Sequence, residues 1–216
     1  MGGSSDTTVS EAVSRALDVV VAAVLLAVAW PVLAVIALAI RVTMGSPVLF
    51  RQRRAGRAGQ TFELVKFRTM RNAAPGADGP DTDAARLTRL GRVLRASSLD
   101  ELPTLVNVLR GDMSLVGPRP LPVHYLARYS SHHARRHEVL PGITGWAQIN
   151  GRNSLAWDQQ LDLDVWYVDN RSPRLDVRIM LATIASVLRR DGINHDGHAT
   201  RPEFRGSGTD RAQPAL

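Results

Sequence analysis

Cysteine is absent from the 216 residues, which excludes a disulfide framework and any zinc site built on thiolates. Lysine is almost absent as well, because Lys66 is the single one and arginine supplies the rest of the 27 basic residues, against 20 acidic ones. The net charge of +7 suits contact with nucleic acid, an anionic membrane surface or a phosphate-bearing substrate, and charge alone does not separate these. The sequence also contains no internal repeat, no Gly-x-Gly-x-x-Gly and no P-loop motif.

An uncharged run dominates the N-terminal part of the chain. Residues 19–40 read VVVAAVLLAVAWPVLAVIALAI, and as a helix they would be about 33 Å long, close to the thickness of the hydrocarbon core of a bilayer. A helix without a polar face lies in lipid or is fully buried, and in a chain of this size we expect lipid. A cleaved signal peptide is the remaining alternative, but the preceding residues are mainly acidic and the run continues past the small residues Ala27–Ala29.

The topology of this run stays open on the residues alone. Pro31, preceded by Trp30, lies near its middle, where it removes one backbone hydrogen bond and predicts a kink. The kink suits a tolerated bend in a spanning helix, and equally a re-entrant hairpin that enters and leaves on one face. Arginines are concentrated after the run, in residues 41–57, so the positive-inside tendency places the remainder of the chain in the cytoplasm.

The rest of the sequence predicts a mixed α/β domain. The expected elements are strands at 46–52 and 60–70, a Gly- and Pro-rich loop at 72–84, and amphipathic helices at 85–95 and 177–188. The last helix could pack on the core or lie in a membrane interface. Residues 130–139 hold three histidines that suggest a metal cluster, but their strongly polar surroundings favour a solvated helix. From about Thr200 the composition predicts a poorly ordered tail.

An acidic pair, Asp100–Glu101, stands at the head of an apolar-periodic stretch. Ser98 to Glu101 has the form of a capping box, and acidic residues are favoured in a first helical turn, so the local sequence favours a structural role. Pro103 is tolerated best if the helix begins near Asp100, and Gly111 is a natural stop. The same helix start attracts phosphate, and a carboxylate there can ligate a divalent cation or attack phosphorus.

The motifs around this pair resemble those of one enzyme family, the small monotopic phosphoglycosyl transferases, which are bacterial sugar transferases. The two most specific segments are LDELPTLVNVLRGDMSLVGPRPL, which starts at residue 99, and RHEVLPGITGWAQINGRN, which ends at residue 153. FELVKFRTM, LDVWYV and DGHAT give further support. The similarity extends from about residue 15 to about residue 204, nearly the whole chain.

The resemblance implies transfer of a phospho-sugar from a UDP-sugar to a polyprenyl phosphate such as undecaprenyl phosphate, with Mg²⁺ and release of UMP. It places this reaction at the cytoplasmic face of the bacterial inner membrane. It further implies that Asp100 is the nucleophile, that Glu101 assists it, and that both carboxylates bind the metal. The expected substrate-binding residues are Lys66, Arg119, Arg152 and Asp176. The expected partners are the lipid bilayer and downstream glycosyltransferases, and no nucleic acid.

The resemblance also favours the re-entrant form of the N-terminal helix, with Trp30 and Pro31 at the membrane kink. The implied fold is a compact, α-rich α/β cytoplasmic domain that rests on the membrane through interfacial amphipathic helices. Its expected parts are an N-terminal segment at 1–18, the re-entrant helix at 19–40, the catalytic domain at 41–200 and the tail at 201–216. Two departures are Trp30, where many members carry Ser, and residues 169–176, where Pro and Arg replace apolar residues.

Each proposed site residue has a plain structural alternative. Arg119 between two prolines can hold a turn by bonding carbonyls, Lys66 can be a solvated strand residue, Arg152 can clamp a loop, and Asp176 can cap a helix or pair with Arg178. For the whole chain, the rival is a basic, membrane-tethered adaptor that binds anionic lipid or nucleic acid without catalysis. The sequence does not reveal the oligomeric state or the sugar, although the short form and the GHAT tail favour an N-acetylated amino sugar.

Overall fold

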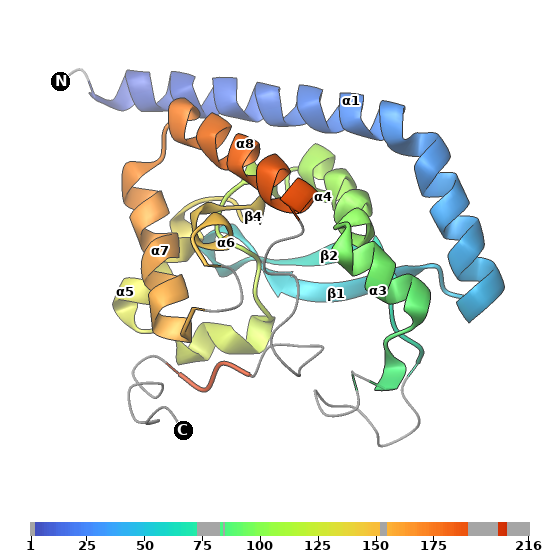
Figure 1. Ribbon diagram of the computed structural model, residues 1–216. Helices are drawn as coiled ribbons and strands as arrows, with labels where there is room; N and C mark the ends of the chain where they lie inside the picture. The colour runs from blue at the N-terminus through green and yellow to red at the C-terminus, as the bar shows by residue number, and fades with distance from the viewer. Residues whose placement is uncertain (1–2, 73–82, 84, 152–154, 190–202, 207–216) are drawn as a thin grey trace.

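The computed structural model describes residues 3–72, 83, 85–151, 155–189 and 203–206. One long helix lies along the molecule and the other elements gather on one side of it, as Figure 1 shows. The longer helices are α1 (Gly3–Met44), α3 (Arg89–Ala96), α7 (Trp157–Asn170) and α8 (Pro173–Arg189). They accompany two small sheets, β1–β2 and β3–β4, so the predicted α-rich α/β class is confirmed.

Helix α1 continues beyond both ends of the predicted 19–40 run. Its apolar side chains are largely exposed, with Val28 at 73% and Trp30 at 65% accessibility, and the helix is long and apolar enough to cross a membrane. Pro31 lies inside the helix, and Figure 1 shows that α1 bends sharply between a long N-terminal arm and a shorter C-terminal arm. Proline is the usual cause of such a bend, but a bend alone does not establish re-entry, which stays a prediction.

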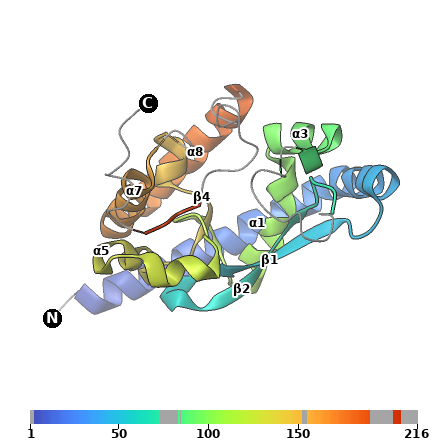
Figure 2. The same ribbon diagram turned by 90° about the horizontal axis from the view of Figure 1, so that it is seen from below.

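α1 is fixed to the same domain on both sides of its apolar run. Before the run, the guanidinium of Arg15 donates to the carbonyl of Val108 at 2.6 Å. At the C-terminal end, the buried side chain of Arg68 donates to the carbonyls of Met44 and, at 2.9 Å, Gly45. Between these two attachments, α1 crosses the full width of the domain in both views (Figures 1 and 2).

Strands β1 (Leu49–Ala55) and β2 (Thr61–Phe67) form an antiparallel hairpin. β2 lies within the strand predicted at 60–70, whereas β1 begins three residues later than the strand predicted at 46–52. The edge of β2 that faces away from β1 pairs with no third strand among the described residues. The backbone of Val65 on this edge forms hydrogen bonds with side chains instead. Its N–H donates to Oδ1 of Asn107 at 3.1 Å, and its carbonyl accepts from Oγ1 of Thr104 at 2.9 Å. These side chains satisfy buried backbone groups that would otherwise be unpaired.

Thr104 and Asn107 belong to a continuous helical segment, the 3₁₀ helix η2 (Leu99–Thr104) followed by α4 (Leu105–Arg110). The buried face of α4 includes a polar residue, because Asn107 is fully buried whereas Leu109 is 37% exposed. A 3₁₀ helix has three residues per turn instead of about 3.6. The side chains of α4 therefore point in directions rotated about the helix axis from those of one continuous α-helix. The predicted stop is confirmed, because Gly111 caps α4 with a φ of 94°.

The second sheet holds the C-terminal half together. β3 (Ser114–Val116) pairs in parallel with β4 (Gly142–Thr144), next to the short helix α6 (Trp146–Ile149). A Cβ at Gly117 would lie 2.4 Å from the carbonyl oxygen of Leu140, so only glycine permits this close approach. This packing fixes the start of the Pro118–Pro120 turn.

The histidine-rich segment is not the solvated helix that we predicted. It forms the short helix α5 (Ser131–Ala134) and a following 3₁₀ turn, and His133 and Arg136 are buried. Burial is tolerated because carboxylates pair with both: His133 Nε2 lies 2.9 Å from Asp162 Oδ1, and Arg136 pairs with Asp164. Direct histidine–aspartate contacts also explain why His132, His133 and Asp162 bring three ligand atoms within 4.8 Å of one another.

Two predicted elements differ from the structure. The helix expected at 85–95 is interrupted: residues 85 and 86 are helical, residues 87 and 88 are not, and α3 begins at Arg89, where the Thr88 hydroxyl accepts the N–H of Gly91 at 2.9 Å and caps it. The predicted disordered tail starts too early, because Phe204 is fully buried in an aromatic cluster with Tyr125 and Trp157. Residues 207–216 lie outside the described residues.

Candidate active site

Asp100 and Glu101 occupy the first turn of η2, within one residue of the predicted helix start. The predicted capping box is wrong, because Ser98 adopts a left-handed φ of 56° and its hydroxyl makes no capping hydrogen bond. The Glu101 carboxylate instead accepts a hydrogen bond from Arg119 Nη2 at 2.6 Å. The two carboxylates are therefore free of the purely structural role that the local sequence favoured.

Four basic side chains interact electrostatically with this acidic pair. Together with the two carboxylates they form what we call the charged cluster: Lys66, Arg95, Arg119, Arg54, Asp100 and Glu101. Four cations against two anions leave an excess of positive charge in a partly desolvated place. Such an excess suits a ligand that brings several negative charges, such as a diphosphate.

Asp100 is the more deeply buried of the two carboxylates, at 5% accessibility. Burial, followed by the neighbouring charge of Glu101, raises its pKa to about 6, so it is mostly ionised at neutral pH but more basic than an ordinary aspartate. No described residue donates a hydrogen bond to this carboxylate. Its oxygens are thus available to an electrophile or a cation.

Glu101 and Arg119 form the tightest pair in the cluster. Burial alone would raise the pKa of Glu101, but the charge and hydrogen bond of Arg119 hold it below its usual value. The same contact raises the pKa of Arg119. The alternative that Arg119 only holds its turn by bonding carbonyls is therefore wrong, since its side chain is directed at the acidic pair.

Lys66 lies on β2 opposite Phe50, with its Nζ 5.4 Å from the centre of that ring. Burial lowers its pKa to about 8, against the opposing influence of Glu101 and Asp100. The alternative of a solvated strand lysine is thus wrong. Val65, its neighbour in the strand, is fixed by Thr104 and Asn107, which sets the position of Lys66 relative to η2.

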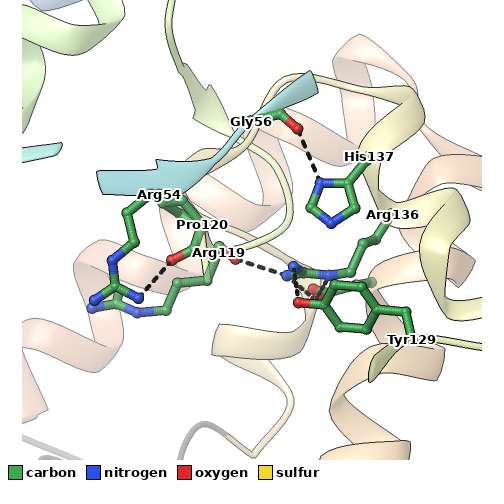
Figure 3. Close-up of polar contacts among 8 residues, drawn as sticks. Arg54, Gly56, Arg119, Pro120, Tyr129, Arg136 and His137 are labelled. Atoms are coloured by element: carbon green, nitrogen blue, oxygen red, sulfur yellow. Dashed lines mark hydrogen bonds and ion pairs between the residues drawn. The ribbon is translucent and has the colours of Figure 1, made fainter. Parts of the chain in front are cut away.

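The backbone of the Pro118–Arg119–Pro120 turn is held from two sides, as Figure 3 shows. On one side, Nη2 of the buried Arg136 donates to the Arg119 carbonyl at 2.7 Å and to Asp164 at 2.7 Å. On the other side, Nη1 of Arg54 lies 3.4 Å from the Pro120 carbonyl. These contacts orient the turn from which the Arg119 side chain reaches Glu101.

The donor set fits the magnesium ion that the family resemblance implies. Mg²⁺ prefers carboxylate oxygens and keeps several waters, and the Asp100 carboxylate has its oxygens unoccupied by described donors. Mutual repulsion with Glu101 raises the pKa of Asp100, and a cation beside the pair would relieve that repulsion. Asp100 and Glu101 are the residues that would hold it.

One predicted site residue, Asp176, is not part of this arrangement. Asp176 lies in the first turn of α8 and accepts a hydrogen bond from the Tyr167 hydroxyl at 2.7 Å. It lines a pocket with Asp18 and Arg171, and no residue of the charged cluster lines that pocket. Arg178, which we considered as its partner, lies over the ring of Trp146 instead. Arg152 lies outside the described residues, so its role stays a prediction.

Sequence reasoning missed three residues that build the site. Arg54 was noted only as part of the basic segment after the membrane run, and Asn107 and Arg136 were not singled out. A signal existed for Asn107, which interrupts an apolar-periodic helix. No sequence signal distinguished Arg54 from the neighbouring arginines, because its role depends on which face of β1 packs against the Pro118–Pro120 turn.

Comparison with known proteins agrees with this site. Residues 9–190 match the family described as bacterial sugar transferase. The uncharacterized sugar transferase EpsL of Bacillus subtilis is 53% identical over 169 residues, or 78% of this chain and 84% of the relative. The UDP-glucose:undecaprenyl-phosphate glucose-1-phosphate transferase of Caulobacter vibrioides is 44% identical, over 82% of this chain and 70% of the relative.

The corresponding Escherichia coli enzyme, of the same name, is 38% identical over 82% of this chain but only 40% of its own length. This chain thus spans less than half of that longer relative. The relatives and the family match cover the segments that contain the acidic pair and the Pro-Arg-Pro turn. The chain therefore belongs to the bacterial sugar transferase family and is a phosphoglycosyl transferase.

Proposed function

We propose that this protein transfers a sugar-1-phosphate from a UDP-sugar to undecaprenyl phosphate and releases UMP. The observation that carries the proposal is the charged cluster, in which a buried, unpaired carboxylate stands among four cations. Named relatives act on glucose and on undecaprenyl phosphate, and a Salmonella relative is named for galactose. These names favour a hexose donor over the N-acetylated amino sugar that we expected from the sequence.

In the first displacement, an oxygen of Asp100 attacks the phosphorus that bears the sugar. The bond from that phosphorus to the bridging oxygen breaks, and UMP leaves with the bonding electrons. Arg119 and Lys66 bind the diphosphate oxygens as negative charge builds on the leaving phosphate. Mg²⁺ held by Asp100 and Glu101 would supply further neutralisation of the diphosphate.

In the second displacement, an oxygen of the polyprenyl phosphate attacks the same phosphorus, and the bond to Asp100 breaks. The carboxylate is restored, and the sugar is now joined to the lipid through a diphosphate. Two steps keep the nucleotide and the lipid phosphate from meeting in one complex, where like charges would repel. A carboxylate with a pKa near 6 is basic enough to attack and is a competent leaving group from phosphorus.

We further propose that α1 is a re-entrant membrane helix, which places the cluster near the lipid head groups on the cytoplasmic side. Support comes from the attachment of α1 to one domain both before and after its apolar run. In a spanning helix, Arg15 and Met44 would lie on opposite sides of the membrane and could not both contact that domain. The exposed face of α8, with Leu181 at 62% and Ile184 at 57% accessibility, gives a second apolar surface for the interface.

The Asp100→Asn variant tests the proposed reaction. The amide has the same shape but cannot attack phosphorus, so we expect loss of turnover with labelled UDP-glucose and undecaprenyl phosphate, and loss of any trapped phospho-sugar adduct. Asp158→Asn is the matched control, because Asp158 lies in the first turn of α7 and outside the cluster. Normal turnover by Asp100→Asn would show that the nucleophile is assigned wrongly.

A further inference from the structure

Arg54 is a half-buried arginine without an acidic partner. No ion pair of Arg54 with a carboxylate exists within the described part of the chain. Its Nε is buried and has no hydrogen-bond partner, its Nη2 donates to the neutral amide of Gln52 at 2.6 Å, and its Nη1 makes only a long contact to Pro120. A buried cation is normally paired, so its isolation requires an explanation.

Burial and the charge of Arg119 disfavour the charged form of Arg54, and the opposing influence of Tyr125 and Glu101 does not fully offset them, so its pKa is lowered to about 10. Figure 3 shows its guanidinium drawn next to that of Arg119, and repulsion from Arg119 adds to the effect of burial on Arg54. Arg119 already uses its hydrogen-bonding capacity partly on Glu101. Two neighbouring guanidinium groups, of which only that of Arg119 bonds to a carboxylate, form an arrangement that an anion would stabilise.

The contact of Arg54 with the Pro120 carbonyl is not the only link between β1 and the Pro118–Pro120 turn. The end of β1 is already joined to the turn through backbone groups, because the N–H of Ala55 donates to the carbonyl of Leu121 at 3.0 Å and a β-bridge links Arg54 with Pro122. The 3.4 Å contact to Pro120 is longer than an ordinary N–H···O hydrogen bond of about 2.9 Å. A phosphate oxygen could replace it at little cost.

We propose that Arg54 is a second diphosphate-binding residue, which acts beside Arg119 on the donor substrate. The inference rests on the proposed function, because it assigns a ligand to the same charged cluster. Arg119 is tied to Glu101, whereas Arg54 has its Nη1 available for a second phosphate oxygen. The two arginines would thus hold the diphosphate from two directions while Asp100 attacks.

Arg54→Gln and Arg53→Gln form a matched pair, because Arg53 is the exposed neighbour on the opposite face of the same strand. We expect Arg54→Gln to weaken binding of UDP-glucose and of inorganic pyrophosphate about 10- to 100-fold, as loss of a charge-assisted contact predicts. Uncharged uridine should bind equally to both variants, and Arg53→Gln should stay within twofold of the wild type. Equal affinities of wild type and Arg54→Gln for pyrophosphate and UDP-glucose would overturn the inference.

The melting temperature of each variant shows whether Arg54→Gln remains folded. If it does not, Arg54→Lys replaces it, because lysine retains the positive charge but lacks the planar guanidinium that binds two oxygens at once. We expect its affinity for pyrophosphate and UDP-glucose to be three- to tenfold weaker than that of the wild type. Unchanged affinity in Arg54→Lys would then overturn the inference. Turnover by the wild type is measured separately: a wild type that binds pyrophosphate through Arg54 but releases no UMP would contradict the proposed function and leave the anion site standing.

Discussion

At the scale of single residues, the site combines groups whose charges are shifted by burial and by one another. Lys66 and Arg54 have pKa values lowered by burial to about 8 and about 10, while Asp100 has its pKa raised to about 6. Each of these pKa shifts means that, without a ligand, the site disfavours the charged form of that side chain relative to water. A bound diphosphate would favour the charged form of both cations, so ligand binding and protonation are coupled.

This coupling predicts a loss of activity at alkaline pH that belongs to Lys66. The folded pKa is below the ordinary value of a lysine, so the charge is present at pH 7 and is lost as the pH rises through about 8. Because kcat/KM reports the free enzyme, we expect kcat/KM for UDP-glucose to fall above pH 8 while saturating substrate protects kcat. Lys66→Arg should move this fall beyond pH 9, since arginine stays charged. If kcat/KM of Lys66→Arg falls above pH 8 as in the wild type, the fall belongs to another titrating group.

At the scale of elements, the buried amide of Asn107 determines how strand and helix meet. Its Oδ1 accepts from Val65, and its Nδ2 donates to the carbonyl of Glu63 at 2.7 Å and to Asp112 at 3.0 Å. One side chain thus connects β2, α4 and the turn that follows α4. Since β2 contributes Lys66 and η2 contributes the acidic pair, this amide fixes the distance between the two halves of the site.

Asn107→Ala is therefore expected to lower both stability and activity. It leaves the N–H of Val65 and the carbonyl of Glu63 buried without partners, which costs about 3 kcal/mol in the free energy of unfolding. Asn170→Ala is the control, because Asn170 is an exposed residue with one hydrogen bond, to Trp166, and should cost less than about 1 kcal/mol. Denaturant titration in detergent compares the two. Equal losses would show that the amide of Asn107 has no special structural role.

At the scale of the whole molecule, α1 packs into the hydrophobic core of the domain and is not a separate membrane anchor joined to it by a linker. Ala22 is fully buried in the core with Val108 and Met113, and Ile40 is fully buried with Phe67. The apolar middle of the helix between these points is exposed. The domain is thus expected to lie against the membrane, with its position set by packing on both arms of α1.

The absence of cysteine allows this topology to be tested directly. Ala16→Cys and Thr43→Cys place single thiols on exposed positions of α1 on either side of its apolar run. A re-entrant helix predicts that a membrane-impermeant maleimide labels both thiols in inverted vesicles and neither in intact spheroplasts. A spanning helix predicts that the two thiols are labelled from opposite sides. The cysteine-free protein gives the background.

Local sequence predicted those features that depend on neighbouring residues. Strand β2 follows from alternation, the helix start near Asp100 follows from Pro103, and the end of α4 follows from Gly111. The same reasoning was wrong for residues 130–139, where polarity indicated solvent exposure. Arg136 and His133 are buried there because acidic partners reach them from α7, about 30 residues later in the chain.

The sequence by itself determined the apolar helix, the membership of a sugar transferase family and the acidic pair, because these are matters of composition, run length and motif. The family resemblance implied Lys66 and Arg119 as substrate-binding residues, but only the tertiary structure decided that Arg54 lies near Arg119 and that Asp176 does not. Arg54 is placed by a strand and Arg119 by a turn held on Arg136, while Asp176 lies in another pocket. Charges separated by dozens of residues interact only after packing removes the water between them, so no local pattern could identify this set.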